Sequence, residues 1–438
     1  MAEKTILLYS PLLTPRLQYA GRHIGSMLPG AVMDLTSSRD EAVASSGPVI
    51  NYSAEPVEGA LNVMPSGLLG ESGVRPLDVV PAGLGGRTVI FPSPGGDDLG
   101  FDIFSAAFYM LSRYEEYLPA GRDRHGRFPW QESMACRYGL SWEPLVDHWA
   151  GMLMEAISQR YPAVSFPERE FRFIPTIDVD VPWAYRNRGL IRTIGGFAKA
   201  AATGNVADLK TRYRVLFRGW DDPYDTYDRI RMIHSEYGVT PVFFFSAGSY
   251  GRFDKSVSPQ NKEYRRLIMD ISAGSEWGIH PSYRSFGQPE RLDMEMETLA
   301  RITGEAPVRS RNHYLRFSFP ESCRMLDAAG IREDYTLGWA EMTGFRAGTC
   351  TPFPFYDLER EEAGSLTLFP FQVMDGTLCD YMKLDSGEAA VHGSEIAARV
   401  RQTGGTLVTL WHNETFSGQG RWRNWEKVYL EIIKTAMG

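Results

Sequence analysis

Short apolar runs and longer amphipathic segments alternate along the chain from residue 171 onward. The short runs are rich in β-branched and aromatic residues, as in buried strands, and predict strands at 171–180, 240–248, 276–283, 306–314, 331–336, 365–375 and 405–413. Apolar residues spaced by three and four predict helices at 224–237, 261–275, 290–303, 320–329, 394–403 and 422–437. Repeated strand–helix units predict an α/β fold with a mostly parallel sheet, and about seven strands favour a distorted, nearly closed (β/α) barrel.

Residues 1–165 have a different pattern, which predicts a small α/β unit. Strands are expected at 5–11, 47–53 and 87–94, and helices that stop near prolines at 101–119 and 142–162. The charged loop between these two helices could be solvated or could cover a site, and His125 within it is expected at the surface. We therefore expect an N-terminal α/β domain at 1–165 and a barrel at 170–438, with 189–222 as an excursion after the first barrel strand.

Composition narrows the range of partners. The 438 residues carry a formal net charge of -8, and acidic and basic residues are interleaved, so we expect neither a nucleic-acid footprint nor a polybasic membrane patch. No apolar stretch reaches the ~18 residues of a membrane span, and no secretory signal is evident. We expect a cytoplasmic protein that binds a small molecule or a neutral polymer, with its four cysteines as free thiols. The oligomeric state is left open.

Polar side chains gather where the predicted strands end, at the edge where barrels of this kind carry their active sites. Asp178 and Asp180 follow period two on the first barrel strand, so both carboxylates face the same way and repel unless a cation, a shared proton or solvent accounts for them. Each such residue alone could cap a turn, meet an arginine or fill the core. The agreement of several strand ends favours a site, formed by Asp178, Asp180, His280, Arg311, His313, Asp375 and His412.

The motifs "TIDVD" (176–180), "GIHPSY" (278–283), "RNHY" (311–314) and "TLWHN" (409–413) follow one another in this order. In order and approximate spacing they resemble the polysaccharide deacetylases of carbohydrate esterase family 4 and their divergent relatives, over roughly residues 170–438. The resemblance implies a deacetylase-like barrel and a metal-dependent hydrolase that removes an acetyl group from an N-acetylated sugar or polysaccharide precursor. The preceding region resembles an uncharacterised domain that accompanies such barrels in some bacterial chains.

The resemblance also implies roles for individual residues. Asp178 would be the catalytic base, oriented by Arg311, and His412 the general acid. Asp180 and His280 would bind the metal. Zn²⁺ is the expected ion, with Co²⁺, Ni²⁺ and Mn²⁺ as alternatives.

The chain departs from the family pattern at the second metal-binding histidine, where position 284 is arginine. A guanidinium is always protonated and cannot ligate a cation. His313 and Asp375 are the candidate replacements, and His313 is preferred because it lies two residues after Arg311, on the same face of an extended strand. Its rival role is to bind the substrate or to fill the rim of the barrel.

Substrate contacts are expected from residues near the same strand ends. Backbone N–H groups at 282–283 are expected to stabilise the oxyanion, and aromatic rings are suited to stack on sugars. The expected substrate-binding residues are Ser282, Tyr283, Tyr314, Trp339, Asp375 and Trp411.

Two other functions remain open from the sequence. A metal-independent glycoside hydrolase would need two separated carboxylates, which Asp178 with Asp375 or Glu414 could supply. Alternatively, Arg284 in the place of a ligand could mark a catalytically inactive carbohydrate-binding module.

Overall fold

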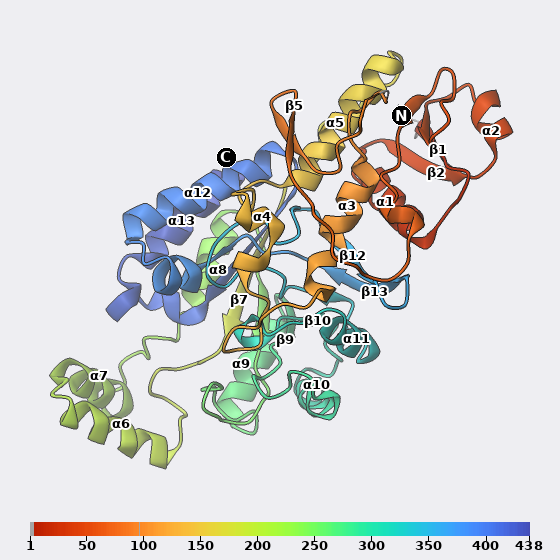
Figure 1. The fold of residues 1–438 in the computed structure, drawn as a ribbon. Coiled ribbons are helices and arrows are strands. Elements are labelled where there is room, and N and C mark those ends of the chain that lie inside the picture. Colours follow the sequence, from red (N-terminus) through yellow and green to blue (C-terminus); the bar gives the residue numbers. More distant parts are fainter. Residues whose placement is uncertain (1–3, 96) are drawn as a thin grey trace.

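The fold is mixed α/β and is built around one large sheet and one small one, with a separate two-stranded antiparallel sheet of β5 (Ala82–Leu84) and β6 (Arg87–Val89) (Figure 1). It is a computed structural model that describes residues 4–95 and 97–438. The large sheet has nine strands in the order β12 (Phe353–Asp357), β13 (Glu362–Leu368), β11 (Glu333–Asp334), β10 (Arg309–Ser310), β9 (Glu276–Ile279), β8 (Val242–Phe245), β7 (Arg172–Val179), β15 (Thr406–His412) and β14 (Val373–Met374).

Strand direction in the large sheet follows the prediction, whereas closure of the barrel is not confirmed. Every neighbouring pair is parallel except β12 with β13. No pairing joins β12 to β14 within the described part of the chain, so the hydrogen-bonded order is open. In the central register, Asp178 on β7 lies opposite His412 on β15 and Phe244 on β8. The carboxyl ends of the central strands therefore meet at one edge.

A helix is present in each of the six places where one was predicted after residue 220, although some begin at a different residue than predicted. The six helices are α8 (Tyr227–Glu236), α9 (Lys262–Ser272), α10 (Pro289–Thr303), α11 (Glu321–Ala328), α12 (Ser386–Gln402) and α13 (Trp425–Met437). α12 begins eight residues earlier than predicted because Asp385 and Glu388 form a capping box that starts the helix there.

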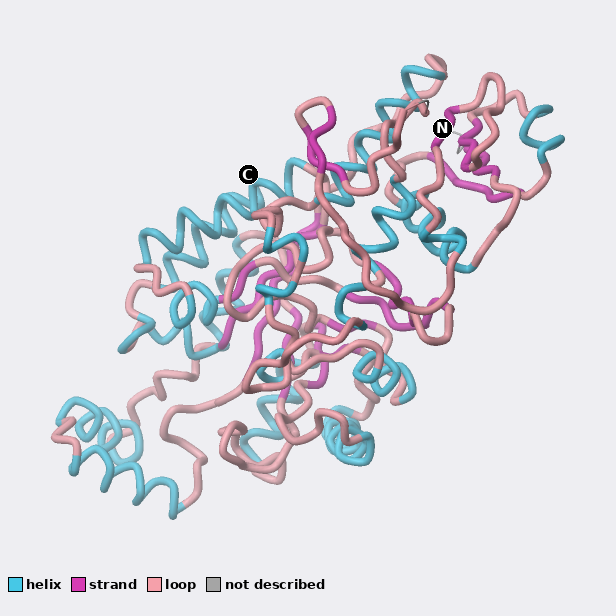
Figure 2. Tube along the Cα trace, in the orientation of Figure 1, coloured by secondary structure: helices cyan, strands magenta, loops and turns pink. Residues whose placement is uncertain are grey.

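Two parts of the barrel region differ from the prediction. The single strand expected at 365–375 is divided into β13 and β14, and Pro370, which lacks a backbone donor, lies in the break between them. The excursion at 189–222 is a helical hairpin of α6 (Leu190–Ala202) and α7 (Val206–Phe217). Both ribbon and tube views place this hairpin away from the large sheet (Figures 1 and 2).

The N-terminal region contains the small parallel sheet, whose order is β2 (Ala31–Thr36), β1 (Lys4–Tyr9), β3 (Val49–Tyr52) and β4 (Leu61–Val63). Helices α1 (Pro15–Ser26), α3 (Ile103–Leu111) and α5 (Leu145–Arg160) belong to the same region. The helix expected at 101–119 ends early because Arg113 adopts a left-handed conformation, and a short 3₁₀ turn follows.

Apolar side chains from the two halves share one hydrophobic cluster, which includes Ile6 and Phe104 together with Ile177 and Leu407. A buried ion pair between Glu116 and Arg346, 2.6 Å apart, also joins the halves. The division into domains at 165–170 therefore stays a prediction. Among the described helices, none combines the length and the apolar character needed to cross a membrane.

Candidate active site

The first carboxylate of the site, Asp178, is buried near the end of β7 beside a buried arginine. Arg311 Nη1 lies 3.1 Å from Asp178 Oδ1, and Arg311 Nε donates to the Tyr335 carbonyl at 3.0 Å. The guanidinium also lies over the Phe244 ring. Its contacts hold Arg311 behind Asp178 rather than in the open cavity, so it can orient the carboxylate without touching a substrate.

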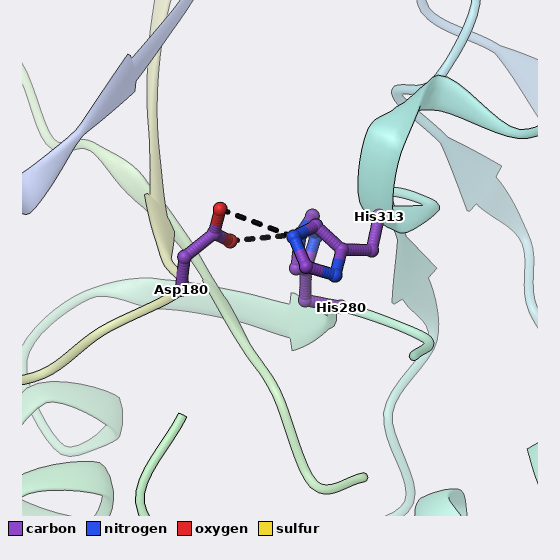
Figure 3. Close-up of side chains that lie close together, drawn as sticks. All are labelled: Asp180, His280 and His313. Atoms are coloured by element: carbon purple, nitrogen blue, oxygen red, sulfur yellow. Dashed lines mark ion pairs between the residues drawn. The ribbon is translucent and has the colours of Figure 1, made fainter. Parts of the chain in front are cut away.

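Asp180 faces two imidazoles, from the ends of β9 and β10 (Figure 3). Its Oδ1 lies 3.0 Å from His280 Nε2 and its Oδ2 lies 3.2 Å from His313 Nε2. Burial by itself would raise the pKa of Asp180, but His313 and His280 outweigh it and hold that pKa well below the usual range. The carboxylate is therefore ionised at neutral pH.

These three side chains fit a divalent cation. Their ligand atoms all lie within 4.8 Å of one another, and within the described residues this is the single group of three such side chains. Asp180 Oδ1 and both ring nitrogens of His280 are buried without a hydrogen-bond partner, although Nε2 and Oδ1 are close. A cation bound at ~2.0–2.2 Å by one carboxylate oxygen and two imidazoles would satisfy Asp180 Oδ1 and His280 Nε2. The other ring nitrogen of His280, Nδ1, lies 3.8 Å from Asp178 Oδ2. Arg284 is exposed and lies outside this group.

A second carboxylate, Asp254, fixes the orientation of His313. Asp254 Oδ1 accepts from His313 Nδ1 at 2.9 Å and from the Tyr283 N–H at 2.8 Å. This leaves His313 Nε2 directed at Asp180. Burial lowers the pKa of His313, but Asp180 and Asp254 together raise it to about 9. Carboxylate support of this kind is a common feature of metal-binding histidines.

His412 lies at the end of β15 and is paired with Asp375. Its Nδ1 donates to Asp375 Oδ1 at 2.8 Å, and its backbone N–H donates to the other carboxylate oxygen at 2.8 Å. Thr415 also donates to Asp375, which is fully buried. Burial opposes the charged imidazole, yet Asp375 raises the pKa of His412 well above its usual value. A protonated His412 Nε2, 3.7 Å from Asp180, is therefore available as an acid.

A cavity of about 370 Å³ opens onto these groups. Asp178, Asp180, His280, His313 and His412 all line it. Its remaining wall includes aromatic rings and charged groups, among them Phe253, Tyr314, Tyr381, Trp422, Arg127, Lys255, Asp380, Glu414 and Arg421. The cavity can therefore present both ring faces and hydrogen-bonding groups to a ligand.

Several residues expected at the substrate lie elsewhere. Of that set, Tyr314 alone lines this cavity. Trp411 is fully buried and packs on Tyr429, while Trp339 is buried beside Arg346. Asp375 is covered by its contacts with His412.

The stretch at 282–283 also differs from expectation. Ser282 lines a neighbouring cavity, and Tyr283 stacks on Phe253. The backbone N–H groups of Ser282 and Tyr283 already donate to Glu295 and Asp254, so they are not free for an oxyanion.

The N-terminal region contributes residues to the site that were not expected there. Arg127 lines the cavity and pairs with Asp123 and Glu341 at 2.7 and 2.9 Å. His125, expected at the surface, is buried, and its Nδ1 lies 3.2 Å from the Tyr283 hydroxyl. The loop between the two predicted helices thus covers part of the site. The many charged residues of this loop were the feature of the sequence that pointed to such a role.

Comparison with known proteins gives a family match for the N-terminal region alone. The family of unknown function DUF7033 matches residues 6–162. No curated protein matches the chain.

Several solved structures match the chain at low similarity. A Mycobacterium smegmatis protein assigned as a polysaccharide deacetylase is 18% identical, with a TM-score of 0.39, and the match covers 63% of this chain and 87% of that one. The allantoinase Puue is 12% identical, with a TM-score of 0.40 and coverage of 61% and 84%. The carbohydrate deacetylase Agd3 is 8% identical, with a TM-score of 0.36 and coverage of 99% and 83%. These identities and TM-scores are too low to indicate an activity, which is therefore inferred from the side chains of the cavity.

Proposed function

We propose that this protein is a metal-dependent amidohydrolase that removes the acetyl group from an N-acetylated sugar or sugar-containing precursor. The observation that carries the proposal is the convergence of three units on one cavity: the Asp178–Arg311 pair, the Asp180–His280–His313 group and the His412–Asp375 pair. An acid, a base and a cation site at one place can together catalyse the hydrolysis of an amide.

Each unit has a separate part in the reaction. Asp180, His280 and His313 would hold the cation, and Zn²⁺ suits this donor set, with Co²⁺, Ni²⁺ and Mn²⁺ as alternatives. When bound, such an ion supplies Lewis acidity, which lowers the pKa of water and polarises an acyl oxygen. Asp178, held in place by Arg311, accepts the proton of the attacking water.

His412 completes the reaction as the acid. Its raised pKa, caused by Asp375 against the effect of burial, keeps the imidazole protonated near neutral pH. The Nε2 proton can then pass to the departing amine. Tyr314 and Phe253 in the cavity wall offer faces on which a sugar ring can stack.

The two rival functions have less support. Asp375 is fully buried and bonded to His412, so it is a poor second carboxylate for a glycoside hydrolase. Glu414 lines the cavity but is already paired with Arg421 and accepts from the Trp422 indole. An inactive module was suggested by Arg284, yet His313 lies beside Asp180 and His280 and offers a third ligand atom in place of residue 284.

The test is a free-amine assay on N-acetylglucosamine oligomers and on nucleotide-linked N-acetylhexosamines. Protein stripped with chelator and reconstituted with each of the four metals should release free amine, and Asp178→Asn should not. Sugar binding in calorimetry without amine release under any of these metals would favour the inactive module. Release of reducing sugar that survives chelation would favour the glycoside hydrolase.

A further inference from the structure

The α6–α7 hairpin exposes an unusual concentration of apolar side chains. Seven of the twenty exposed large hydrophobic residues of the described chain fall between 190 and 220. They are Leu190, Ile191, Ile194, Val206, Tyr213, Phe217 and Trp220, and the most exposed is Ile191 at 88%. Figures 1 and 2 show the hairpin projecting from the body of the molecule, and the exposed fractions show that these side chains are largely uncovered.

The exposed apolar residues form a face on each helix. Leu190, Ile191 and Ile194 follow helical spacing on α6, so their side chains point to one side. On α7, Val206, Tyr213 and Phe217 are separated by seven and four residues and also share a side. α6 therefore turns an apolar side to solvent, whereas the exposed side of α7 combines these apolar residues with Lys210, which lies four residues after Val206.

The same segment is strongly basic. Residues 186–220 contain eight Lys or Arg residues and a single Asp, in a chain with a net charge of -8. The even interleaving of charges expected from the composition does not hold here. Lys199 and Lys210 are exposed and form no ion pair with any described residue. Arg214 and Arg218 lie over the rings of Trp220 and Tyr213, with their charged ends close to exposed aromatic groups.

Positive charge continues into a cavity at the base of the hairpin. This cavity, of about 900 Å³, is lined by Arg188, Arg192, Arg284 and Arg291, which we call the arginine cleft. None of the four forms an ion pair within the described residues, and Arg188 Nε is buried without a hydrogen-bond partner. The one acidic residue in the lining, Glu295, accepts from the Ser282 N–H and hydroxyl. The cleft is suited to phosphate groups.

A second copy of the chain is a poor occupant for this surface. A symmetric contact would place the basic segment of one copy against the same segment of the other, and like charges at an interface are unfavourable. Exposed apolar faces flanked by Lys and Arg are instead typical of helices that lie in the headgroup region of a membrane. Anionic lipids complement the charge of the segment.

We propose that the α6–α7 hairpin docks this protein on the surface of an anionic lipid bilayer. The apolar faces of α6 and α7 enter the headgroup region, and the surrounding Lys and Arg residues, with the arginine cleft, contact lipid phosphates. This docking is separate from the proposed hydrolase activity and can be measured without a substrate.

The test is co-sedimentation of the full chain with lipid vesicles. Wild-type protein should bind vesicles of equimolar phosphatidylglycerol and phosphatidylcholine, bind pure phosphatidylcholine far less, and dissociate at high salt. Leu190→Ser with Ile191→Ser should weaken binding by ~10-fold or more, because two inserted side chains are lost. The matched control is Val43→Ser with Val391→Ser, two residues that are 65% and 62% exposed on other helices. It should bind like wild type.

Substitution of two lysines tests the electrostatic part of the proposal independently. Lys199→Gln with Lys210→Gln should weaken binding on the order of 20-fold, whereas Lys262→Gln with Lys427→Gln should not. Equal binding to both kinds of vesicle, or binding that the hairpin variants leave unchanged, would overturn the proposal. So would a wild-type dimer that Leu190→Ser with Ile191→Ser converts to a monomer, since the face would then be an interface between copies.

Discussion

The cavity at the sheet edge and the α6–α7 hairpin use charged residues in opposite ways. Asp178 and Arg311 have side chains that are 3% and 0% exposed, and they form an ion pair at 3.1 Å. In the hairpin, Lys199 and Lys210 are exposed, and the neighbouring apolar residue Ile191 is 88% exposed. In the cavity, the charged side chains are buried and packed against apolar groups. In the hairpin, the charged side chains lie in solvent beside exposed apolar groups.

The difference separates two kinds of function. Buried, mutually oriented charges are held in fixed positions by packing, which is the condition for chemistry on a small ligand. Exposed cations among apolar side chains have no such fixed partner and suit association with a large surface. Substitutions should therefore affect metal binding, catalysis and stability in the cavity, and affect association with little change in stability in the hairpin.

The largest effect is expected at the metal ligands. Asp180→Ala and His280→Ala should each reduce the bound metal from one equivalent to background after dialysis, and hydrolysis should fall with it. Circular dichroism should stay unchanged because both side chains lie at strand ends. Arg284→Ala is the matched control and should keep its metal, since Arg284 lies outside the group. A full equivalent of metal in Asp180→Ala and His280→Ala would remove them from the site.

The stability comparison uses one cation from each region. Arg311→Met should lower the free energy of unfolding by about 3–5 kcal/mol, because Asp178 is left buried without its partner. Lys210→Met should change it by no more than about 0.5 kcal/mol, as is usual for an exposed site. Urea denaturation of the two variants measures the difference. Equal changes in the free energy of unfolding would mean that Asp178 does not depend on Arg311 for its stability in the folded protein.

The variant Asp178→Asn tests whether Asp178 is the catalytic base or a metal ligand. As the base, Asp178 should be dispensable for metal binding, while hydrolysis should fall by ~10² or more because the water's proton has no acceptor. Metal analysis and the free-amine assay on the same preparation provide both values. Loss of the metal would instead identify Asp178 as a ligand, and an unchanged rate would exclude it from the mechanism.

Asp254→Asn tests the support of His313. Metal affinity should fall by ~10–100-fold, the usual cost of losing a carboxylate behind a ligating histidine. Asp380→Asn is the control, because Asp380 lines the same cavity but pairs with Arg421. Titration with a competing chelator compares the two. The same affinity in both variants would contradict the role given to Asp254.

The smallest effect concerns a buried histidine away from the cavity. Burial lowers the pKa of His234 to about 4, below its value in the unfolded chain. The neutral form is therefore the native one, and the stability it contributes is present above pH ~6.5 and is lost as the pH falls towards 4. We expect wild type to lose about 1–2 kcal/mol more than His234→Gln between pH 7 and pH 5. Identical pH dependence in urea denaturation would show that His234 does not titrate in this way.

The sequence was a good guide to the residues on strands. The carboxyl ends of parallel strands share one edge, so Asp178, His280 and His412 could be expected to meet from periodicity alone. His313 was chosen because an extended strand would place it on the same face as Arg311. Its Nε2 does lie beside Asp180, but β10 ends at Ser310 and His313 begins a 3₁₀ turn, so the extended conformation behind that choice is wrong. Closure of the sheet could not be judged, because the pairing of edge strands depends on long-range geometry.

Other residues came from segments without a regular pattern. Asp254 and Arg127 lie in loops, where spacing predicts no direction for a side chain, and their contacts with His313 and Glu341 follow from tertiary packing. The two helices of the hairpin were not predicted because their Gly and Ala residues obscure the spacing of apolar and polar positions by which helices are recognised. The basic character of the hairpin is visible in the sequence, but charge alone did not predict two helices with exposed apolar residues.

The central claim is that Asp180, His280 and His313 together bind a divalent cation. An anomalous-difference map from crystals grown with Zn²⁺ tests it most directly. We predict one strong peak ~2.0–2.2 Å from a carboxylate oxygen of Asp180, a ring nitrogen of His280 and Nε2 of His313. A peak bound by Asp180 and His280 with His313 beyond reach, or no peak among the three, would contradict the account.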